Sequence, residues 1–281
     1  MLPPLPWRRT FAALPLLLAG GAATAQASSP LDADNPGRPA WEAGFAAGGG
    51  RVADYPGADE SHTRAIVVPV VIYRGPILRV DQGGIRGRLV DSPDWEFNLS
   101  ATAAFSARDS TARQGMPGLD YLFGVGPQLI YKGLGATTLH LKARALMSTD
   151  FRRIDGRGVS FDPEVRWRTR PFAGSPSLLT LSLQPTWATR ELQRYFYQVD
   201  ASQATPQRPA HRARAGYLGT ELALTLSGRR SASLSWFVTA RGMSLHGAAN
   251  ASSPLLRDKS NFNLGAGLVW MPWRSSALAP D

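Results

Sequence analysis

The chain has four histidines, which could do acid–base or nucleophilic chemistry, and it has no cysteine. His62 and His211 fall in polar stretches, His246 falls at the end of an expected strand, and His140 falls beside Lys142 on a polar strand face. Without cysteine there can be no thiol nucleophile, thiolate metal site or disulfide. A catalytic triad is defined by geometry and not by spacing, so the sequence assigns no partner to any histidine. We predict that the protein is not an enzyme and has no catalytic residues.

Metal and cofactor sites have no spacing signature either. The acidic pairs Asp32 with Asp34 and Asp59 with Glu60 fall in expected leading or turn segments. The run Gly48-Gly49-Gly50 is not followed by the Gly-Lys-Ser/Thr of a phosphate-binding loop. We therefore predict neither a metal nor a cofactor.

The remaining candidate functional side chains are cationic. The chain has 31 lysines and arginines against 21 acidic residues, which gives a formal net charge of +10. In residues 164–170 (Glu-Val-Arg-Trp-Arg-Thr-Arg) the arginines occupy every second position, which puts them on one face of a strand. No nucleic-acid-binding module accompanies this charge, so nucleic acid is not an expected partner. We predict instead a basic cluster that lines the interior of the fold: Lys142, Arg144, Arg166, Arg168, Arg170 and Arg241.

The elements that position these side chains are strands, since apolar and polar residues alternate with a period of two along most of the chain. In the clearest run, residues 95–106, Trp95 and Phe97 share one face while Glu96 and Asn98 share the other. No amphipathic helix of three turns is expected. Such runs predict about twelve strands, near residues 41–50, 65–74, 76–81, 84–90, 95–106, 121–132, 137–148, 159–169, 178–189, 215–228, 231–244 and 260–272.

Two β architectures compete for this pattern: a soluble sandwich or barrel with its apolar face inside, and an outer-membrane barrel with that face toward lipid. Several runs reach ~10–14 residues, whereas strands of soluble proteins are usually ~5–6. Aromatic residues at the ends of runs, such as Trp95, Tyr121, Trp187 and Trp270, match the interfacial girdles of membrane barrels. We predict an all-β fold, a transmembrane antiparallel outer-membrane β-barrel of about 12 strands (roughly 10–14).

The beginning of the chain predicts export. Trp7-Arg8-Arg9 supplies a positive region, residues 11–19 are apolar, and Ala23-Thr24-Ala25 resembles a cleavage site, as in a secretory signal peptide. We predict four regions: a signal peptide at 1–25, a flexible N-terminal segment at 26–40, the barrel at 41–273 and a C-terminal tail at 274–281. The expected location is the outer membrane of a Gram-negative bacterium.

The organisation of the chain resembles the MipA/OmpV family of outer-membrane proteins. The segments that carry the resemblance are Gly44-Phe45 through Gly50, Asp54-Tyr55-Pro56-Gly57-Ala58-Asp59, Val68-Pro69, Tyr73-Arg74, Gly118-Leu119-Asp120, Gly124-Val125-Gly126-Pro127, Tyr195-Phe196-Tyr197-Gln198-Val199 and Ala251-Ser252-Ser253-Pro254-Leu255-Leu256. Two features depart from the pattern: Tyr197 replaces a usual glycine, and the chain continues past Trp273, where barrels usually end on an aromatic residue.

The resemblance implies a non-enzymatic scaffold that links a lytic transglycosylase and a murein-synthesising penicillin-binding protein to the outer membrane. The alternative is a narrow, anion-favouring pore or an adhesin-like channel, and a barrel hydrolase is a third and distant possibility. We consider three roles for the basic side chains. They pair in the lumen with Glu96, Glu164 and Glu221, contact membrane lipid and lipopolysaccharide at the rim, or line an anion pore.

Overall fold

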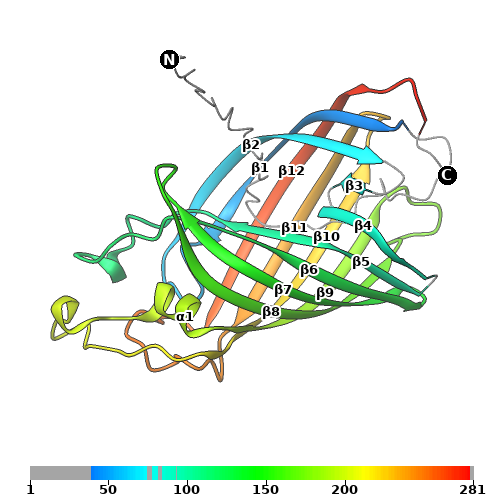
Figure 1. Cartoon of the computed structure of the whole chain (residues 1–281). Coiled ribbons are helices and arrows are strands. Elements are labelled where there is room, and N and C mark those ends of the chain that lie inside the picture. The colour runs from blue at the N-terminus through cyan, green and yellow to red at the C-terminus, as the bar shows by residue number, and fades with distance from the viewer. Residues whose placement is uncertain (1–38, 75–77, 82–83, 93, 279–281) are drawn as a thin grey trace, which may run out of the picture.

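The computed structural model describes residues 39–278 except 75–77, 82–83 and 93 (Figure 1). The predicted signal peptide and nearly all of the predicted segment 26–40 lie outside the described residues. Within the described part of the chain, no helix is long and apolar enough to cross a membrane.

Twelve strands form the body of the structure, and their bounds agree closely with the predicted runs. They are β1 (Trp41–Ala53), β2 (Ser61–Arg74), β3 (Leu78–Asp81), β4 (Gly84–Asp91), β5 (Trp95–Ala104), β6 (Tyr121–Leu134), β7 (Thr137–Thr149), β8 (Ile154–Thr169), β9 (Leu178–Ala188), β10 (Gly216–Arg229), β11 (Leu234–Ser244) and β12 (Ser260–Arg274). In the described part of the chain, one α-helix, α1 (Arg190–Tyr197), and two short 3₁₀ turns, η1 (Thr111–Arg113) and η2 (Ala201–Gln203), lie between strands.

The strands pair antiparallel in chain order, and β1 pairs with both β2 and β12, so the sheet closes into a barrel. At the closing seam Phe45 of β1 lies opposite Trp270 of β12 and opposite Pro69 of β2. The predicted all-β antiparallel barrel of about twelve strands is confirmed.

The two ends of the barrel differ in their connections (Figure 1). One end, here the turn end, carries short connections such as residues 135–136, 170–177 and 230–233. Both described ends of the chain also lie there, since Pro39 forms a bridge with Leu278. The other end, the loop end, carries five connections: residues 54–60, 105–120, 150–153, 189–215 and 245–259. This asymmetry is typical of outer-membrane barrels, in which the short turns face the periplasm.

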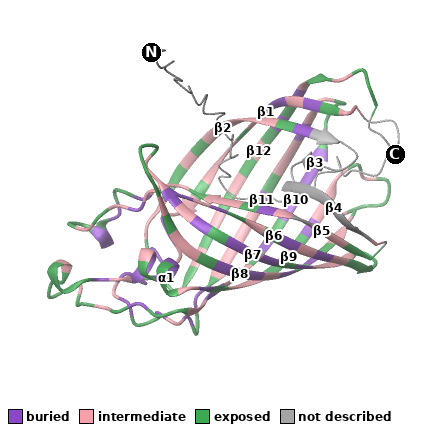
Figure 2. Cartoon of the chain, viewed as in Figure 1, coloured by how far each residue is buried: buried purple, intermediate pink, exposed green. Residues whose placement is uncertain are grey.

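The outer surface of the barrel is apolar, while most of its inner surface is polar. On β8, Val165 and Trp167 are 47% and 41% exposed, whereas Arg166 between them is 5% exposed. Figure 2 shows the same alternation of exposed and buried residues along the strands. Aromatic pairs mark both ends of the exterior: Trp95 with Tyr131 toward the turn end, and Trp187 with Tyr217 toward the loop end. An apolar exterior with two aromatic girdles suits a surface in contact with lipid.

One sector of the wall is short. β3 and β4 have 4 and 8 residues, and both extend from the turn end without reaching the loop end (Figure 1). At a rise of about 3.3 Å per residue, neither strand can cross the hydrocarbon layer of a membrane. The wall between β2 and β5 is therefore complete only in its turn-end half.

Candidate functional site: the charged lumen and its loop cap

The strongest polar interactions inside the barrel join β7 to β8. Lys142 Nζ lies 2.6 Å from Glu164 Oε2, and an Arg166 guanidinium nitrogen lies 2.9 Å from Glu164 Oε1. Arg144 Nη1 lies 3.1 Å from Asp162 Oδ2. All five side chains are buried. Because an unpaired buried charge is far more costly than a paired one, this pairing is what allows the charges to remain in the lumen wall.

Neighbouring hydroxyl and amide groups complete this network. Asp162 accepts hydrogen bonds from Ser160 at 2.7 Å and from Thr186 at 2.8 Å, and Arg144 Nε donates to Ser100 Oγ at 2.8 Å. Lys142 also donates to the side-chain oxygen of Gln184. The network therefore ties β5, β7, β8 and β9 together. It fills one side of the lumen with groups that satisfy one another.

The structure places the members of the predicted basic cluster differently. Lys142, Arg144 and Arg166 belong to the network, and Arg241 lies 3.4 Å from the Glu221 carboxylate on β10. Arg168 is half-buried near the turn end of β8. For Arg170 the prediction of a lumen position is wrong. β8 ends at Thr169, and Arg170 is exposed in the turn that follows. Four of the predicted cations, Lys142, Arg144, Arg166 and Arg241, are consequently paired with carboxylates.

Two of the four histidines, His140 and His62, form hydrogen bonds with neighbouring side chains. Both ring nitrogens of His140 lie 2.8 Å from neutral partners, Gln128 Nε2 and Thr138 Oγ1, and the ring is buried in the lumen wall. His62 Nδ1 lies 2.8 Å from an oxygen of Asp54, which also accepts from Arg64.

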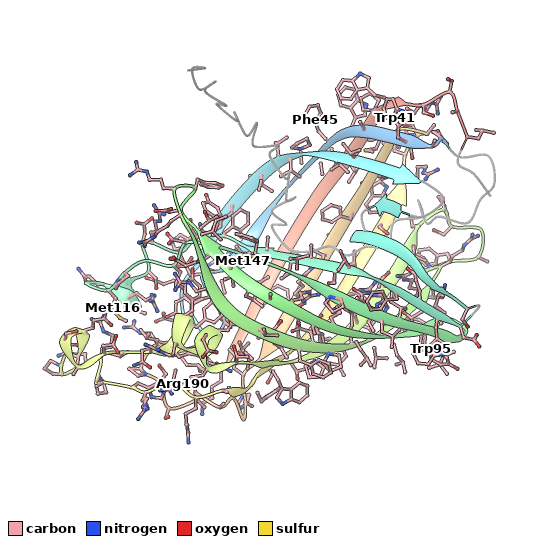
Figure 3. The ribbon with its side chains drawn as sticks, in the orientation of Figure 1. Trp41, Phe45, Trp95, Met116, Met147 and Arg190 are labelled. Atoms are coloured by element: carbon pink, nitrogen blue, oxygen red, sulfur yellow. The ribbon has the colours of Figure 1, made fainter. Side chains whose placement is uncertain are left out.

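A packed layer of loops, the loop cap, lies over the loop end of the barrel. Its buried apolar residues come from every loop-end connection except 150–153, and from the strand ends beneath them. The loop residues are Tyr55, Ala58, Ala107, Ala112, Leu119, Leu192, Phe196, Tyr197, Val199, Ala213, Leu245, Ala248, Leu255 and Leu256. Met116 packs against this layer, and Figure 3 shows Met116 and Arg190 at the loop end, opposite Trp95 at the turn end.

Hydrogen bonds between loops hold the cap together. The Tyr55 hydroxyl donates to the carbonyl of Leu255, and the Tyr197 hydroxyl donates to the carbonyl of Pro56, each at 2.8 Å. Arg113 Nη1 donates to the carbonyl of Phe196 at 3.0 Å. Burial raises the pKa of Tyr55 to about 12 and raises the pKa of Tyr197 further. The phenols are thus held in their neutral, hydrogen-bonding form.

Sequence reasoning missed this cap, although a signal was present. Helix α1 has only two turns, but Leu192 and Phe196 are four residues apart and share one buried face. The segments 54–59, 118–120, 195–199 and 251–256, which carry the family resemblance, all lie in or beside the cap. Tyr197, which departs from the family pattern, is completely buried there. Half of the segments that carry the resemblance thus belong to the loop cap, and the other half lie in the strands β1, β2 and β6.

Below the cap lies a cavity of about 320 Å³. Its walls include the ion-paired side chains of β7, β8, β10 and β11 and hydroxyl groups of β9, and its roof includes Tyr55, Tyr195 and Phe196. A closed antiparallel barrel with a lipid-facing apolar exterior, a polar interior and long loops at one end defines an outer-membrane β-barrel protein.

Comparison with known proteins assigns the family. The chain belongs to the MipA family: the sequence model described as "MltA-interacting protein MipA" matches residues 45–271. Among solved structures, the chain is similar to the NanC porin in its rhombohedral crystal form, with a TM-score of 0.40 and 9% identity over 81% of this chain and 99% of that one. No curated protein matches the chain significantly.

Proposed function

We propose that this barrel is a non-enzymatic scaffold that holds murein enzymes at the outer membrane. The observation that carries the proposal is the loop cap, whose buried side chains come from four of the five loop-end connections and pack together over the loop end of the barrel. A barrel covered in this way is suited to act through its exposed ends. The family description names a protein that interacts with MltA, which makes a lytic transglycosylase the first candidate partner. A penicillin-binding protein is the second candidate.

The turn end supplies a surface for such a partner, since in this class of barrel it faces the periplasm. It presents the apolar side chains of Phe172 and Leu134, which are 76% and 50% exposed. Exposed basic residues surround them: Lys132, Arg170, Arg229, Arg230 and Arg274. Apolar anchors within a charged rim are the usual composition of a protein interface, where the charges accelerate encounter and the anchors hold the partner.

The predicted export fits this role. A signal peptide at residues 1–25 would deliver the chain to the periplasm, and Pro39, the first described residue, lies beside Leu278 at the turn end. Exposed arginines at the loop end, such as Arg152 and Arg153, would then lie near anionic lipopolysaccharide.

The alternative of an anion-favouring pore has weaker support. An anion pore needs cations that face water without partners, whereas Lys142, Arg144 and Arg166 are buried against carboxylates.

The scaffold is tested by affinity purification of the tagged, full-length protein from a detergent-solubilised envelope. We expect a lytic transglycosylase among the enriched proteins. The matched variants are R229E/R230E at the turn end and R152E/R153E at the loop end, since both replace two adjacent exposed arginines. We expect the first to lose the partner and the second to retain it. The scaffold would be refuted if no murein enzyme were enriched above an unrelated barrel.

A further inference from the structure

The cavity below the loop cap has room for a small organic molecule. Its volume of about 320 Å³ lies at the low end of the range of ~300–1,000 Å³ that is usual for small-molecule sites. A buried water needs only ~10–15 Å³. None of the described residues that form the turn-end surface lines this cavity, so a ligand held in it would leave the surface proposed for the murein enzyme free.

The charged side chains in the cavity wall are paired. The described residues of the wall include five carboxylates, and each contacts a cation. The pairs are Asp54 with Arg64, Asp120 with Arg108, Asp162 with Arg144, Glu164 with Arg166 and Glu221 with Arg241. An ion that entered the cavity would lose hydration and would find its opposite charges already paired among these side chains. The wall therefore favours an uncharged ligand.

Two buried polar atoms in the cavity wall can form further hydrogen bonds. The Asp54 carboxylate is 1% exposed, and its Oδ1 lies 2.8 Å from His62 Nδ1 and 2.9 Å from Arg64 Nη2. Its Oδ2 has no hydrogen-bond partner among the described residues. On β9, Thr180 is 5% exposed, and its hydroxyl has no such partner either. Since buried polar groups are nearly always hydrogen-bonded, both atoms indicate a bound molecule, which must carry a donor for Asp54.

The roof of the cavity is largely apolar. Its side chains belong to the loop cap or pack against it, and they include Tyr55, Leu119, Leu192, Tyr195 and Phe196. The hydroxyls of Tyr55 and Tyr195 already donate to the carbonyls of Leu255 and Asp120, so their rings are left to contact a ligand. Water can satisfy the polar atoms of the wall, but it gains nothing from this apolar surface. An apolar surface combined with a few convergent polar groups is typical of a small-molecule site.

A sugar ring has both kinds of surface, because C–H groups cover its faces and hydroxyl groups, which donate and accept, surround its edge. We propose that the cavity is a binding site for a small uncharged carbohydrate. Its hydroxyls bond to Asp54 Oδ2 and Thr180 Oγ1, and its ring lies below the aromatic side chains of the loop cap. This site is independent of the scaffold, so either can fail while the other holds.

The test is equilibrium dialysis of radiolabelled sugars against the full-length protein in phosphatidylcholine nanodiscs, where no sugar-based detergent competes. Three probes share the frame of methyl glucoside and differ only at C6, which carries a hydroxyl, a carboxylate or an ammonium group. We expect saturable binding of the neutral probe with a Kd on the order of 1 mM and at least about fivefold weaker binding of each charged probe. Dialysis continues to equilibrium, so slow entry past the loop cap does not hide binding.

Methyl galactoside and methyl mannoside extend the test to other arrangements of the hydroxyls. Absence of saturable binding by all three neutral glycosides would overturn the proposal, because water would then be the sole occupant of the cavity. Tighter binding of a charged probe than of its neutral counterpart would also overturn it.

Variants locate the site. T180V removes a hydroxyl from the cavity wall at nearly constant volume, and we expect it to weaken binding at least about fivefold. Its control is T137V, since Thr137 is half-buried on β7 and does not line the cavity. A223F should fill the cavity and abolish binding, because Ala223 is buried in its wall on β10. Its control, A240F, changes a residue on β11 that does not line the cavity.

Folding of each variant is measured by migration of the unheated protein on a gel. T180V decides the case in which A223F does not fold, because the Thr180 hydroxyl has no partner to lose among the described residues. Capture of the lytic transglycosylase by T180V should equal that by the wild type, which separates this site from the scaffold. Unchanged sugar binding in both T180V and A223F would also overturn the proposal.

Discussion

Lys142 on β7 and Glu164 on β8 form a buried ion pair with 2.6 Å between Nζ and Oε2, inside a barrel whose outer surface is apolar. Each also has a further partner, Gln184 for Lys142 and Arg166 for Glu164. The pair thus belongs to a network that cross-links strands through the lumen. This is the opposite of an arrangement in which cations face an open aqueous channel.

Removing the carboxylate from this network should destabilise the barrel more than removing the lysine. E164Q leaves Lys142 and Arg166 without their acidic partner, and we expect it to cost about 3–5 kcal/mol of unfolding free energy. K142M leaves Glu164 paired with Arg166, so its cost should be clearly smaller. Urea unfolding in lipid vesicles, followed by tryptophan fluorescence, measures both.

The control for this series is R153M, because Arg153 is 69% exposed and forms only a 3.6 Å contact with Asp155. A pair of this kind should contribute no measurable stability. If E164Q unfolded at the same urea concentration as R153M, the network would have no structural role.

The loop cap should make the wild-type barrel electrically silent. Leu192 and Phe196 form the buried face of α1, and their replacement in L192A/F196A removes packing from the centre of the cap. We expect no stepwise conductance from the wild type in a planar bilayer and intermittent conductance from the variant. Stable, anion-selective steps in the wild type would favour the pore over the closed scaffold.

Because phenols are buried in the loop cap, we expect the stability of the cap to fall at alkaline pH. Burial raises the pKa of Tyr55 and of Tyr195 to about 12 each and raises that of Tyr197 still more. Because the folded state holds these protons more tightly, their stabilising effect is complete below the unfolded pKa of about 10. It is lost as the pH rises from about 10 through about 12.

Absorbance of phenolate at 295 nm measures this directly. Of the seven tyrosines in the chain, Tyr55, Tyr195 and Tyr197 should titrate late, and their titration should coincide with loss of the cap. Y55F should remove one late-titrating group. A single titration of all tyrosines near pH ~10 would show that the cap does not bury them.

The fold was largely predictable because lipid outside and polar groups inside impose a period of two on every long strand. The predicted run 95–106 became β5, Trp95–Ala104, and 260–272 became β12, Ser260–Arg274. The start of β8 was predicted five residues late, at 159 instead of 154. Gly158 has a φ of +90°, and the register with β7 shifts between Leu146 and Met147 opposite it, so the alternation is interrupted there.

The site was less predictable, because its contacts join residues that are remote in sequence. Alternation placed Lys142 and Arg166 inside and offered Glu164 as a partner in the lumen, but it could not show that both cations contact this one carboxylate. The loop cap depends on contacts such as Tyr55 with Leu255, which have no local pattern. Arg170 was misplaced because the alternation of Arg166, Arg168 and Arg170 continues one residue past the end of the strand at Thr169, into the turn.

The central claim, that the turn end binds a murein enzyme, is tested most directly by titrating a purified lytic transglycosylase from the same bacterium onto the barrel in nanodiscs. We predict saturable binding with a Kd on the order of 1 μM. R229E/R230E should weaken it at least about tenfold, while R152E/R153E should leave it within about twofold. Absence of saturable binding, or equal loss in the two variants, would contradict the account.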